Sequence, residues 1–319
     1  MYYLLLFVSL FLFECVYFKL ADKFNIIDKP NERSSHTQIT LRGGGILFYI
    51  GVLLCFLTLD YTYPWFMLGL TLLSVISFID DVRPVPNKIR LGIHFVAVFF
   101  LCWQLGIVEH GSWWLVTLAI IVCTGVINAY NFMDGINGLT GGYSLVVLSV
   151  LAYVNETIVS FVRPEWLGVT ILGVIVFCFF NFRTKAKCFA GDVGAVSIAF
   201  IIMYFLGRLI LHTGDFGFVV LLVVYGVDAI LTIIHRIILH ENLGKAHRKH
   251  LYQLMANELQ IPHLLVSAFY MALQAVIAIG YLWARSISSV WGWWYFGIIT
   301  ALLCGGYCLF MKKYFHLHS

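Results

Sequence analysis

Long apolar runs follow one another along the whole chain, separated by short polar stretches. A helix that crosses a membrane needs about 20 predominantly apolar residues. We predict eleven such spans, at residues 1–20, 43–59, 64–79, 91–108, 112–129, 139–155, 165–181, 193–211, 216–235, 263–284 and 289–311. The runs are continuous, whereas a membrane β-barrel shows short alternating segments. The pattern therefore predicts an all-α, polytopic membrane helix bundle of about 11 transmembrane helices, forming a single domain over residues 1–319.

The composition supports this fold class. Of the 319 residues, 61% are hydrophobic and 11% are charged, whereas soluble domains carry about 25% charged residues. The first apolar run has no basic start and no small-residue cleavage site, so we expect a retained helix and not a signal peptide. The eight cysteines show no metal-ligand spacing, and a disulfide framework is not expected.

The basic residues predict the orientation. Seventeen of the 20 lysines and arginines fall in loops that eleven spans would place on one face, namely 19–42, 80–90, 128–138, 182–192, 236–262 and the tail after 311. Cytoplasmic loops carry an excess of these residues. We therefore expect an outside N-terminus, with the C-terminus and the polar loops in the cytoplasm. The net charge of +4 then reflects orientation and gives no reason to expect nucleic-acid binding.

Two acidic motifs stand at span ends on this face. Asp80 and Asp81 follow each other at the end of the third span, and Asp192 lies between Gly191 and Gly194 at the start of the eighth. Adjacent carboxylates repel each other, which favours a bound cation such as Mg²⁺ or a lysine. The structural alternatives are a helix end with charges that reach the membrane surface, and a helix cap formed by Asp192.

A cluster of amides, "NAYNFMDGINGL", lies between the fifth and sixth spans. Asn128, Asn131 and Asp134 are spaced by three residues, so they can share one site only if the helix ends or unwinds near Asp134. Gly135 favours this ending because glycine tolerates positive φ. Side-chain amides can both donate and accept, which suits a base, a sugar amide or a metal. Caps in a turn would explain only one or two of these residues.

A basic segment, "HENLGKAHRKHLYQL", follows the ninth span. His247 and His250 lie on one side if the segment is helical, with Arg248 between them. The alternative is a basic patch that binds anionic lipid headgroups. Zinc is disfavoured because no cysteine or second histidine pair completes a ligand set. Together, the acids, amides and cations are the groups that phosphoryl transfer requires.

The chain resembles the polyprenyl-phosphate N-acetylhexosamine-1-phosphate transferases of glycosyltransferase family 4, most closely the branch that begins O-antigen and capsule synthesis. The resemblance rests on five motifs in the family's order: "DKPNERSSHTQITLRGGGI" (28–46), "DD" (80–81), "NAYNFMDGINGL" (128–139), "FAGDVGA" (189–195) and "AHRKHLYQL" (246–254). It implies that a lipid phosphate attacks the β-phosphate of a UDP-sugar, which releases UMP.

The resemblance also implies roles for the acids. Asp192 would hold Mg²⁺, with Mn²⁺ as an alternative, and Asn131 would be a second oxygen ligand. Asp80 and Asp81 would organise the lipid phosphate, and one of them is a candidate base. Asp134 would lie by the nucleotide and complete the catalytic acids.

Further residues are expected to contact the substrates. Phe189 would stack on uracil. Asn137 stands where the family commonly has aspartate, and an amide there can still contact the base. The full set of expected substrate contacts is Asn128, Asn137, Lys88, Arg90, Lys187, Phe189, His247, Arg248 and His250.

The implied partners are a UDP-N-acetylaminosugar, most commonly UDP-GlcNAc, together with undecaprenyl phosphate and the bilayer of the bacterial inner membrane. A homodimer is left open. The alternatives are the peptidoglycan-type transferase, which takes phospho-MurNAc-pentapeptide, and a secondary transporter. Transporters carry ionisable groups in mid-span, and here these are few: Glu14, Asp228 and Arg208. Asp228 is expected to face the interior and brace the site.

Overall fold

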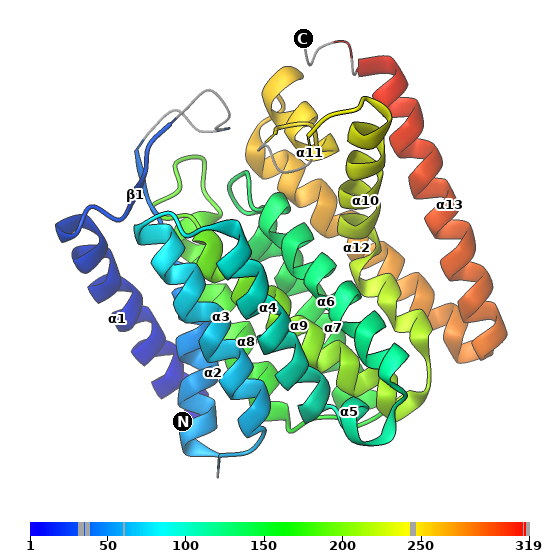
Figure 1. The fold of residues 1–319 in the computed structure, drawn as a ribbon, viewed down its shortest axis with the longest axis horizontal. Helices are drawn as coiled ribbons and strands as arrows, with labels where there is room; N and C mark the ends of the chain where they lie inside the picture. The colour runs from blue at the N-terminus through cyan, green and yellow to red at the C-terminus, as the bar shows by residue number, and fades with distance from the viewer. Residues whose placement is uncertain (31–34, 36–38, 60, 243–246, 315, 317–319) are drawn as a thin grey trace.

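The computed structural model describes residues 1–30, 35, 39–59, 61–242, 247–314 and 316. Figure 1 shows a bundle of helices with two short strands at one end, β1 (Ile27–Asp28) and β2 (Thr40–Leu41), which pair antiparallel. The helices are α1 (Tyr2–Lys23), α2 (Ile46–Thr58), α3 (Pro64–Val82), α4 (Asn87–Gln104), α5 (Ile107–His110), α6 (Trp113–Met133), α7 (Leu139–Thr157), α8 (Pro164–Asn181), α9 (Gly191–Thr213), η1 (Phe216–Leu222), α10 (Val223–Ile238), α11 (Leu251–Gln253), η2 (Leu254–Glu258), α12 (His263–Ile287) and α13 (Ser289–Tyr314).

Each predicted span coincides with one of these helices. Within the described residues, eight helical segments are long and apolar enough to cross a membrane: α1, α3, α6, α8, α9, η1 with α10, α12 and α13. The predicted spans 43–59, 91–108 and 139–155 correspond to α2, α4 and α7. With 13 residues, α2 is about 20 Å long, shorter than a bilayer core of about 30 Å. The polytopic all-α fold is confirmed, and the count of eleven crossings stays a prediction.

The ninth span is not one regular α-helix. Its first seven residues form the tighter 3₁₀ helix η1 before α10 begins. Asp215 starts this turn, because its carboxylate accepts the backbone N–H of Gly217 at 2.9 Å. Just before it, Gly214 ends α9 with φ of +68°, a value that glycine adopts without strain.

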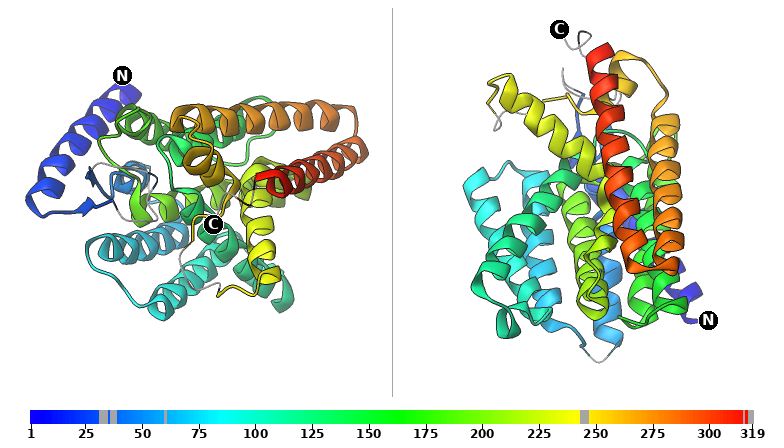
Figure 2. Two further views of the ribbon diagram at one scale, coloured as in Figure 1. Left: turned by 90° about the horizontal axis from the view of Figure 1, so that it is seen from above. Right: turned by 90° about the vertical axis from the view of Figure 1, so that its right-hand side faces the viewer.

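Helix α9 is the centre of the bundle. Its most apolar stretch is 78% buried, against 11% for α13. It packs on α2, α3, α6 and α7, and Ser74 of α3 shares a hydrogen bond of 2.8 Å with Ser197 of α9. A hydrogen bond between buried hydroxyls is a common link between membrane helices. Viewed along the bundle, α13 lies at the periphery beside α12 (Figure 2).

The polar motifs gather at one end of the bundle, which we call the motif end. The strands, the end of α3, the α6–α7 and α8–α9 connections and α11 all lie there, at the top of Figure 1. Helix α1 begins at the opposite end, whereas α13 finishes at the motif end. This is the arrangement that an odd number of crossings requires.

We expect the motif end to face the cytoplasm, and cysteine labelling tests this. Asp215→Cys, at the opposite end, should react with a membrane-impermeant thiol reagent in intact cells, whereas Arg83→Cys should react only after lysis. The unsubstituted protein, with its own eight cysteines, gives the background. Labelling of Arg83→Cys in intact cells would reverse the orientation.

Candidate active site

The start of α9 is capped by a carboxylate from another helix. Asp81, in the last turn of α3, accepts the backbone N–H of Asp192 at 2.9 Å and that of Val193 at 3.0 Å. These N–H groups belong to the first turn of α9 and have no acceptor within their own helix. The Asp81 side chain is fully buried. It therefore fixes the position of α9, and of Asp192, relative to α3.

Glycines allow this close junction. Gly191 has φ of +71°, and a Cβ there would lie 2.6 Å from Oδ2 of Asp81. Gly194 faces Gly45, whose Cα would be 2.6 Å from an added Cβ. A larger residue at either position would push the start of α9 away from its neighbours. The glycines of "FAGDVGA" thus serve packing and backbone geometry.

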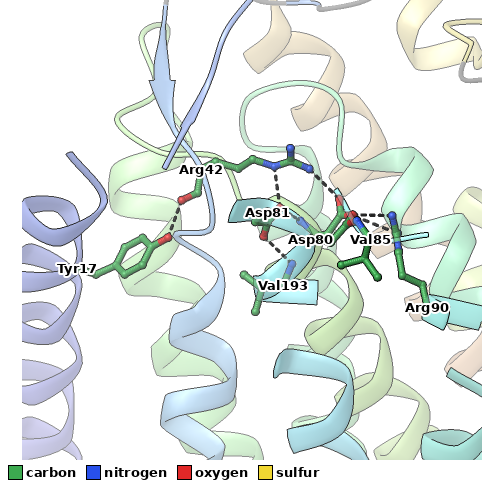
Figure 3. Close-up of polar contacts among 8 residues, drawn as sticks. Tyr17, Arg42, Asp80, Asp81, Val85, Arg90 and Val193 are labelled. Atoms are coloured by element: carbon green, nitrogen blue, oxygen red, sulfur yellow. Dashed lines mark hydrogen bonds and ion pairs between the residues drawn. The ribbon is translucent and has the colours of Figure 1, made fainter. Parts of the chain in front are cut away.

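Two arginines join the three aspartates (Figure 3). The Nε atom of Arg42 lies 2.7 Å from Asp81, and one of its Nη atoms donates to Asp192 at 3.1 Å. Arg90 pairs with Asp80 at 2.6 Å and with the second oxygen of Asp192 at 3.0 Å. Asp192 is therefore held between two guanidinium groups. We call these five residues the charge cluster.

Arg42 remains cationic in this cluster. Burial opposes its charge, but the carboxylates of Asp81 and Asp192 outweigh that cost and raise the pKa of Arg42. The backbone around it is also fixed: Tyr17 of α1 donates to the carbonyl of Arg42 at 2.6 Å. Next to it, the N–H of Phe189 donates to the carbonyl of Leu41 at 2.8 Å, so that Arg42 and Phe189 stand on neighbouring chain segments.

A cleft opens beside the charge cluster. It is lined by Asp28, Ser35, Arg42, Asn131, Asp134, Gly135, Ile136, Asn181, Phe189, Gly191, Asp192 and Gln253. Four residues predicted from two separate motifs meet in this lining: Asn131, Asp134, Phe189 and Asp192. Five others that carry polar groups were not singled out in the sequence, namely Asp28, Ser35, Arg42, Asn181 and Gln253. Arg42 had one local signal, its place just before three glycines.

Helix α6 ends at Met133, so that Asp134 follows directly on the helix, as the glycine pattern predicted. Burial, and to a lesser degree the nearby Asp192, raise the pKa of Asp134 to about 7, while the neighbouring Thr140 hydroxyl partly opposes the shift. A carboxyl group that titrates near neutrality can be charged or neutral in the cell.

The side chain of Asn137 is hydrogen-bonded within the protein. Its amide nitrogen donates to the carbonyl of Arg183 at 2.8 Å and to that of Thr184 at 3.3 Å, and the residue is buried. These bonds give the amide nitrogen a structural role, and the expected contact of Asn137 with the base stays a prediction. Asn181 makes a similar link: its Oδ1 accepts the N–H of Gly138 and its Nδ2 donates to the Cys188 carbonyl, both at 2.8 Å.

The other predicted residues from α4, α6 and the α8–α9 connection lie around the cleft without lining it in the described structure. Asn128 is half-buried on α6, one turn before Asn131. Lys88 and Lys187 are exposed, and the ammonium group of Lys187 lies 5.9 Å from the centre of the Phe180 ring. Asp80 and Arg90 reach the site only through the charge cluster.

The segment from His247 onward meets the cleft through Gln253. His250 is buried, with Nδ1 3.3 Å from a carboxylate oxygen of Asp228. Arg248 pairs with Glu258 at 3.7 Å. Burial, and then the neighbouring His250 and Arg236, lower the pKa of His247 to about 3. Residues 243–246 of this motif lie outside the described residues.

Known proteins share the central part of this chain. Residues 63–209 match the model of glycosyl transferase family 4, a segment that runs from α3 to α9 and includes every member of the charge cluster except Arg42. Fold and site together define a polytopic membrane protein with a charged cleft at one end of its helix bundle. Over this matched segment, the chain is similar to glycosyl transferase family 4.

Three curated relatives carry closely related names. The undecaprenyl-phosphate alpha-N-acetylglucosaminyl 1-phosphate transferase of Escherichia coli (strain K12) is 29% identical over 62% of this chain and 60% of its own. The protein of that name from Yersinia pestis is 30% identical over 64% of this chain and 60% of its own length. The probable undecaprenyl-phosphate N-acetylglucosaminyl 1-phosphate transferase of Bacillus subtilis (strain 168) is 27% identical over 75% and 72%. The matched part of the chain thus spans about 60% of the length of the first two.

The raised pKa of Asp134 predicts a pH effect on stability. An unfolded aspartate loses its proton near pH 3.9, whereas folded Asp134 keeps it to about pH 7. The stability that Asp134 contributes is therefore present below about pH 4 and is lost as the pH rises through 7. In Mg²⁺-free detergent solution, the melting temperature of the native protein minus that of Asp134→Asn should fall over this range. A flat or rising difference would contradict the assignment.

Asn137→Ala should weaken the protein more than it alters donor recognition. The substitution removes the amide that donates to the Arg183 and Thr184 carbonyls, and losing a hydrogen bond typically costs about 0.5–1.5 kcal/mol. We expect a lower melting temperature and an unchanged Kd for a UDP-sugar in the molecules that remain folded. An unchanged melting temperature with a Kd raised tenfold would instead support the direct contact with the base.

Proposed function

We propose that this protein transfers N-acetylhexosamine 1-phosphate from a UDP-sugar to undecaprenyl phosphate and releases UMP. The observation that carries the proposal is the cleft at the motif end of a membrane bundle, where Asp134, Asp192 and Arg42 meet beside Asn131 and Phe189. The names of the relatives support the acceptor and the sugar. UDP-GlcNAc is the proposed donor, and the proposed role is the first membrane step of O-antigen, capsule or related envelope polysaccharide synthesis.

The placement of the cleft suits two substrates of opposite character. One is a water-soluble nucleotide sugar, and the other is a phosphate carried on a hydrocarbon chain that stays in the bilayer. A polar cleft at the end of apolar helices lets both phosphates meet at the membrane surface. With the orientation proposed above, this surface is the cytoplasmic face of the bacterial inner membrane.

Mg²⁺ is the proposed cofactor. No group of three histidine, cysteine or acidic side chains in the described residues forms a ready metal site. Mg²⁺ requires less, because one or two carboxylates suffice when substrate phosphates and waters complete its shell. The donor set fits: Asp192, Asn131 and Asp134 offer carboxylate and amide oxygens to one cleft. When bound, the ion would neutralise negative charge on the diphosphate.

The chain's own residues would position the reacting groups. An oxygen of the lipid phosphate forms a bond to the β-phosphorus of the donor, and the bond from that phosphorus to the bridging oxygen breaks, so that UMP leaves with this oxygen. A phosphate with a second pKa of about 6 is already largely ionised at pH 7. Neither Asp80 nor Asp81 is then needed as a base, which agrees with their engagement by Arg90, Arg42 and backbone N–H groups.

Arg42 is the cation best placed for the donor's phosphates. Its side chain is 32% exposed and lines the cleft, whereas Arg90 joins the cluster from the side of α4. A guanidinium presents several donors in a fixed plane, which matches phosphate oxygens as well as carboxylates. Phe189 in the same lining offers an aromatic face for the uracil ring.

An assay of UMP release tests the proposal directly. Purified protein should release UMP from UDP-GlcNAc only when undecaprenyl phosphate and Mg²⁺ are both present. A panel of other UDP-N-acetylhexosamines would identify the preferred sugar. Release that needs no lipid phosphate would indicate hydrolysis of the donor, and no release from any member of the panel would refute the transfer reaction.

Asp192→Asn should lower this rate by about a hundredfold or more, because charge stabilisation at a phosphate typically contributes that much. The Arg42→Lys variant should also release UMP much more slowly. A compact ammonium lacks the planar set of donors with which a guanidinium can contact two carboxylates and a phosphate together. Arg163→Lys is the matched control: Arg163 precedes α8 and pairs with Glu165 at 3.6 Å, away from the cleft. Near-normal turnover by Asp192→Asn at an ordinary Mg²⁺ concentration would show that Asp192 does not contribute to catalysis.

A further inference from the structure

A second buried carboxylate, Asp228 of α10, gathers an unusual number of hydrogen bonds. It is 3% exposed. Its oxygens accept hydrogen bonds from the backbone N–H groups of Leu251 and Tyr252 and from three side chains, at distances of 2.7 to 3.4 Å; the side chains are Thr232, His250 and Tyr270. Two of these contacts begin the short helix α11. His250 is the N-cap residue of α11, and its ring contact with Asp228 is additional to these two backbone contacts.

His250 is held firmly by one side of its ring. Nδ1 lies 3.3 Å from Oδ1 of Asp228, and the backbone N–H donates to Gln253 at 3.2 Å. The other ring nitrogen, Nε2, is buried and has no hydrogen-bond partner among the described residues. A buried polar atom without a partner costs free energy, and a ligand that hydrogen-bonds Nε2 would remove this cost.

The surroundings of His250 connect it to the cleft. Gln253, which accepts its N–H, lines the cleft. Phe132, two residues before Asp134 in the chain, has its ring 6.1 Å from the His250 ring. The hydroxyl of Tyr252 donates to the Phe132 carbonyl at 2.8 Å, which joins this segment to the end of α6. His250 is thus fixed to the same wall that carries Asp134.

We propose that Asp228 is a positioning residue that acts through His250. By accepting Nδ1–H, the carboxylate fixes the ring and its tautomer and leaves Nε2 to hydrogen-bond the sugar-diphosphate part of the donor. A carboxylate behind a histidine is a common way to orient the ring for a ligand on its other nitrogen. This inference rests on the proposed function for the identity of the ligand.

The test measures equilibrium binding of UDP-GlcNAc with Mg²⁺ to the full-length protein by calorimetry. The Asp228→Asn side chain has one acceptor oxygen where the carboxylate has two, so it cannot keep the hydrogen bonds that the two oxygens accept from different groups. We therefore expect the Kd for UDP-GlcNAc to rise about tenfold. The measured stoichiometry reports the folded fraction, so that a merely structural loss would lower the stoichiometry and leave Kd unchanged. Such a result would overturn the proposal.

A double-mutant cycle tests whether Asp228 acts through His250. In a His250→Ala background, Asp228→Asn should weaken binding no further. Additive losses would show that Asp228 works by another route. Asp215→Asn is the matched control: this carboxylate also accepts several hydrogen bonds, from Gly217, Tyr281 and Arg285, but it lies at the opposite end of the bundle. It should leave Kd unchanged.

Two substitutions of His250 keep the proposal testable if Asp228→Asn does not fold. The amide nitrogen of His250→Asn can replace Nδ1 and keep the contact with Asp228, whereas that of His250→Gln can reach the place of Nε2. We expect His250→Asn to fold and bind about tenfold more weakly, with His250→Gln closer to the native Kd. If His250→Asn and His250→Gln both bound UDP-GlcNAc with the native Kd, the proposed role of Nε2 would be overturned.

The two hypotheses fail in different ways. If the native protein binds UDP-GlcNAc but releases no UMP with undecaprenyl phosphate, the transfer reaction is refuted, and the Kd comparison still decides the role of Asp228. If it transfers the sugar phosphate and the Kd values do not respond to Asp228 or His250, the positioning role alone is refuted. If it binds no UDP-sugar at all, both are overturned.

Discussion

The need to neutralise three aspartates at the edge of a membrane shapes the rest of the site. Charged groups that leave water are costly unless they are paired and hydrogen-bonded. Arg42 and Arg90 provide that pairing, and both reach Asp192. The chain must therefore bring β2, α3, α4 and α9 to one point. The glycines at the start of α9, the strand pair and the tyrosine of α1 are consequences of this requirement.

The cleft owes its shape to polar side chains that hydrogen-bond within the protein. Asp81 starts α9 from a neighbouring helix, while Asn137 and Asn181 tie the α6–α7 connection to the α8–α9 connection. Asp228 does the same for the segment that carries His250. Each fixes an irregular segment through backbone groups, which is how a loop at the mouth of a bundle can hold functional groups as precisely as a helix does.

The sequence was sufficient for the fold class, the helices and four of the residues that line the cleft, namely Asn131, Asp134, Phe189 and Asp192, because apolar runs and clustered acids and amides are local signals. It could not separate residues that face the cleft from those that hold it. Asp81 and Asp192 are 111 positions apart, and nothing local indicates that one caps the other. Arg42 looked like one basic residue among many, and Asn137 looked like its neighbours until its buried partners were known. The 3₁₀ turn before α10 was hidden because it is as apolar as the helix that follows.

A cryo-electron microscopy structure with UDP-GlcNAc and Mg²⁺ would test the central claim most directly. The account predicts the diphosphate in the cleft beside Arg42, with the metal ion between it and Asp192, and the uracil ring against Phe189. The ring of His250 should contact the sugar diphosphate through Nε2. A nucleotide sugar bound elsewhere, with the charge cluster unchanged and no ion at Asp192, would contradict the account.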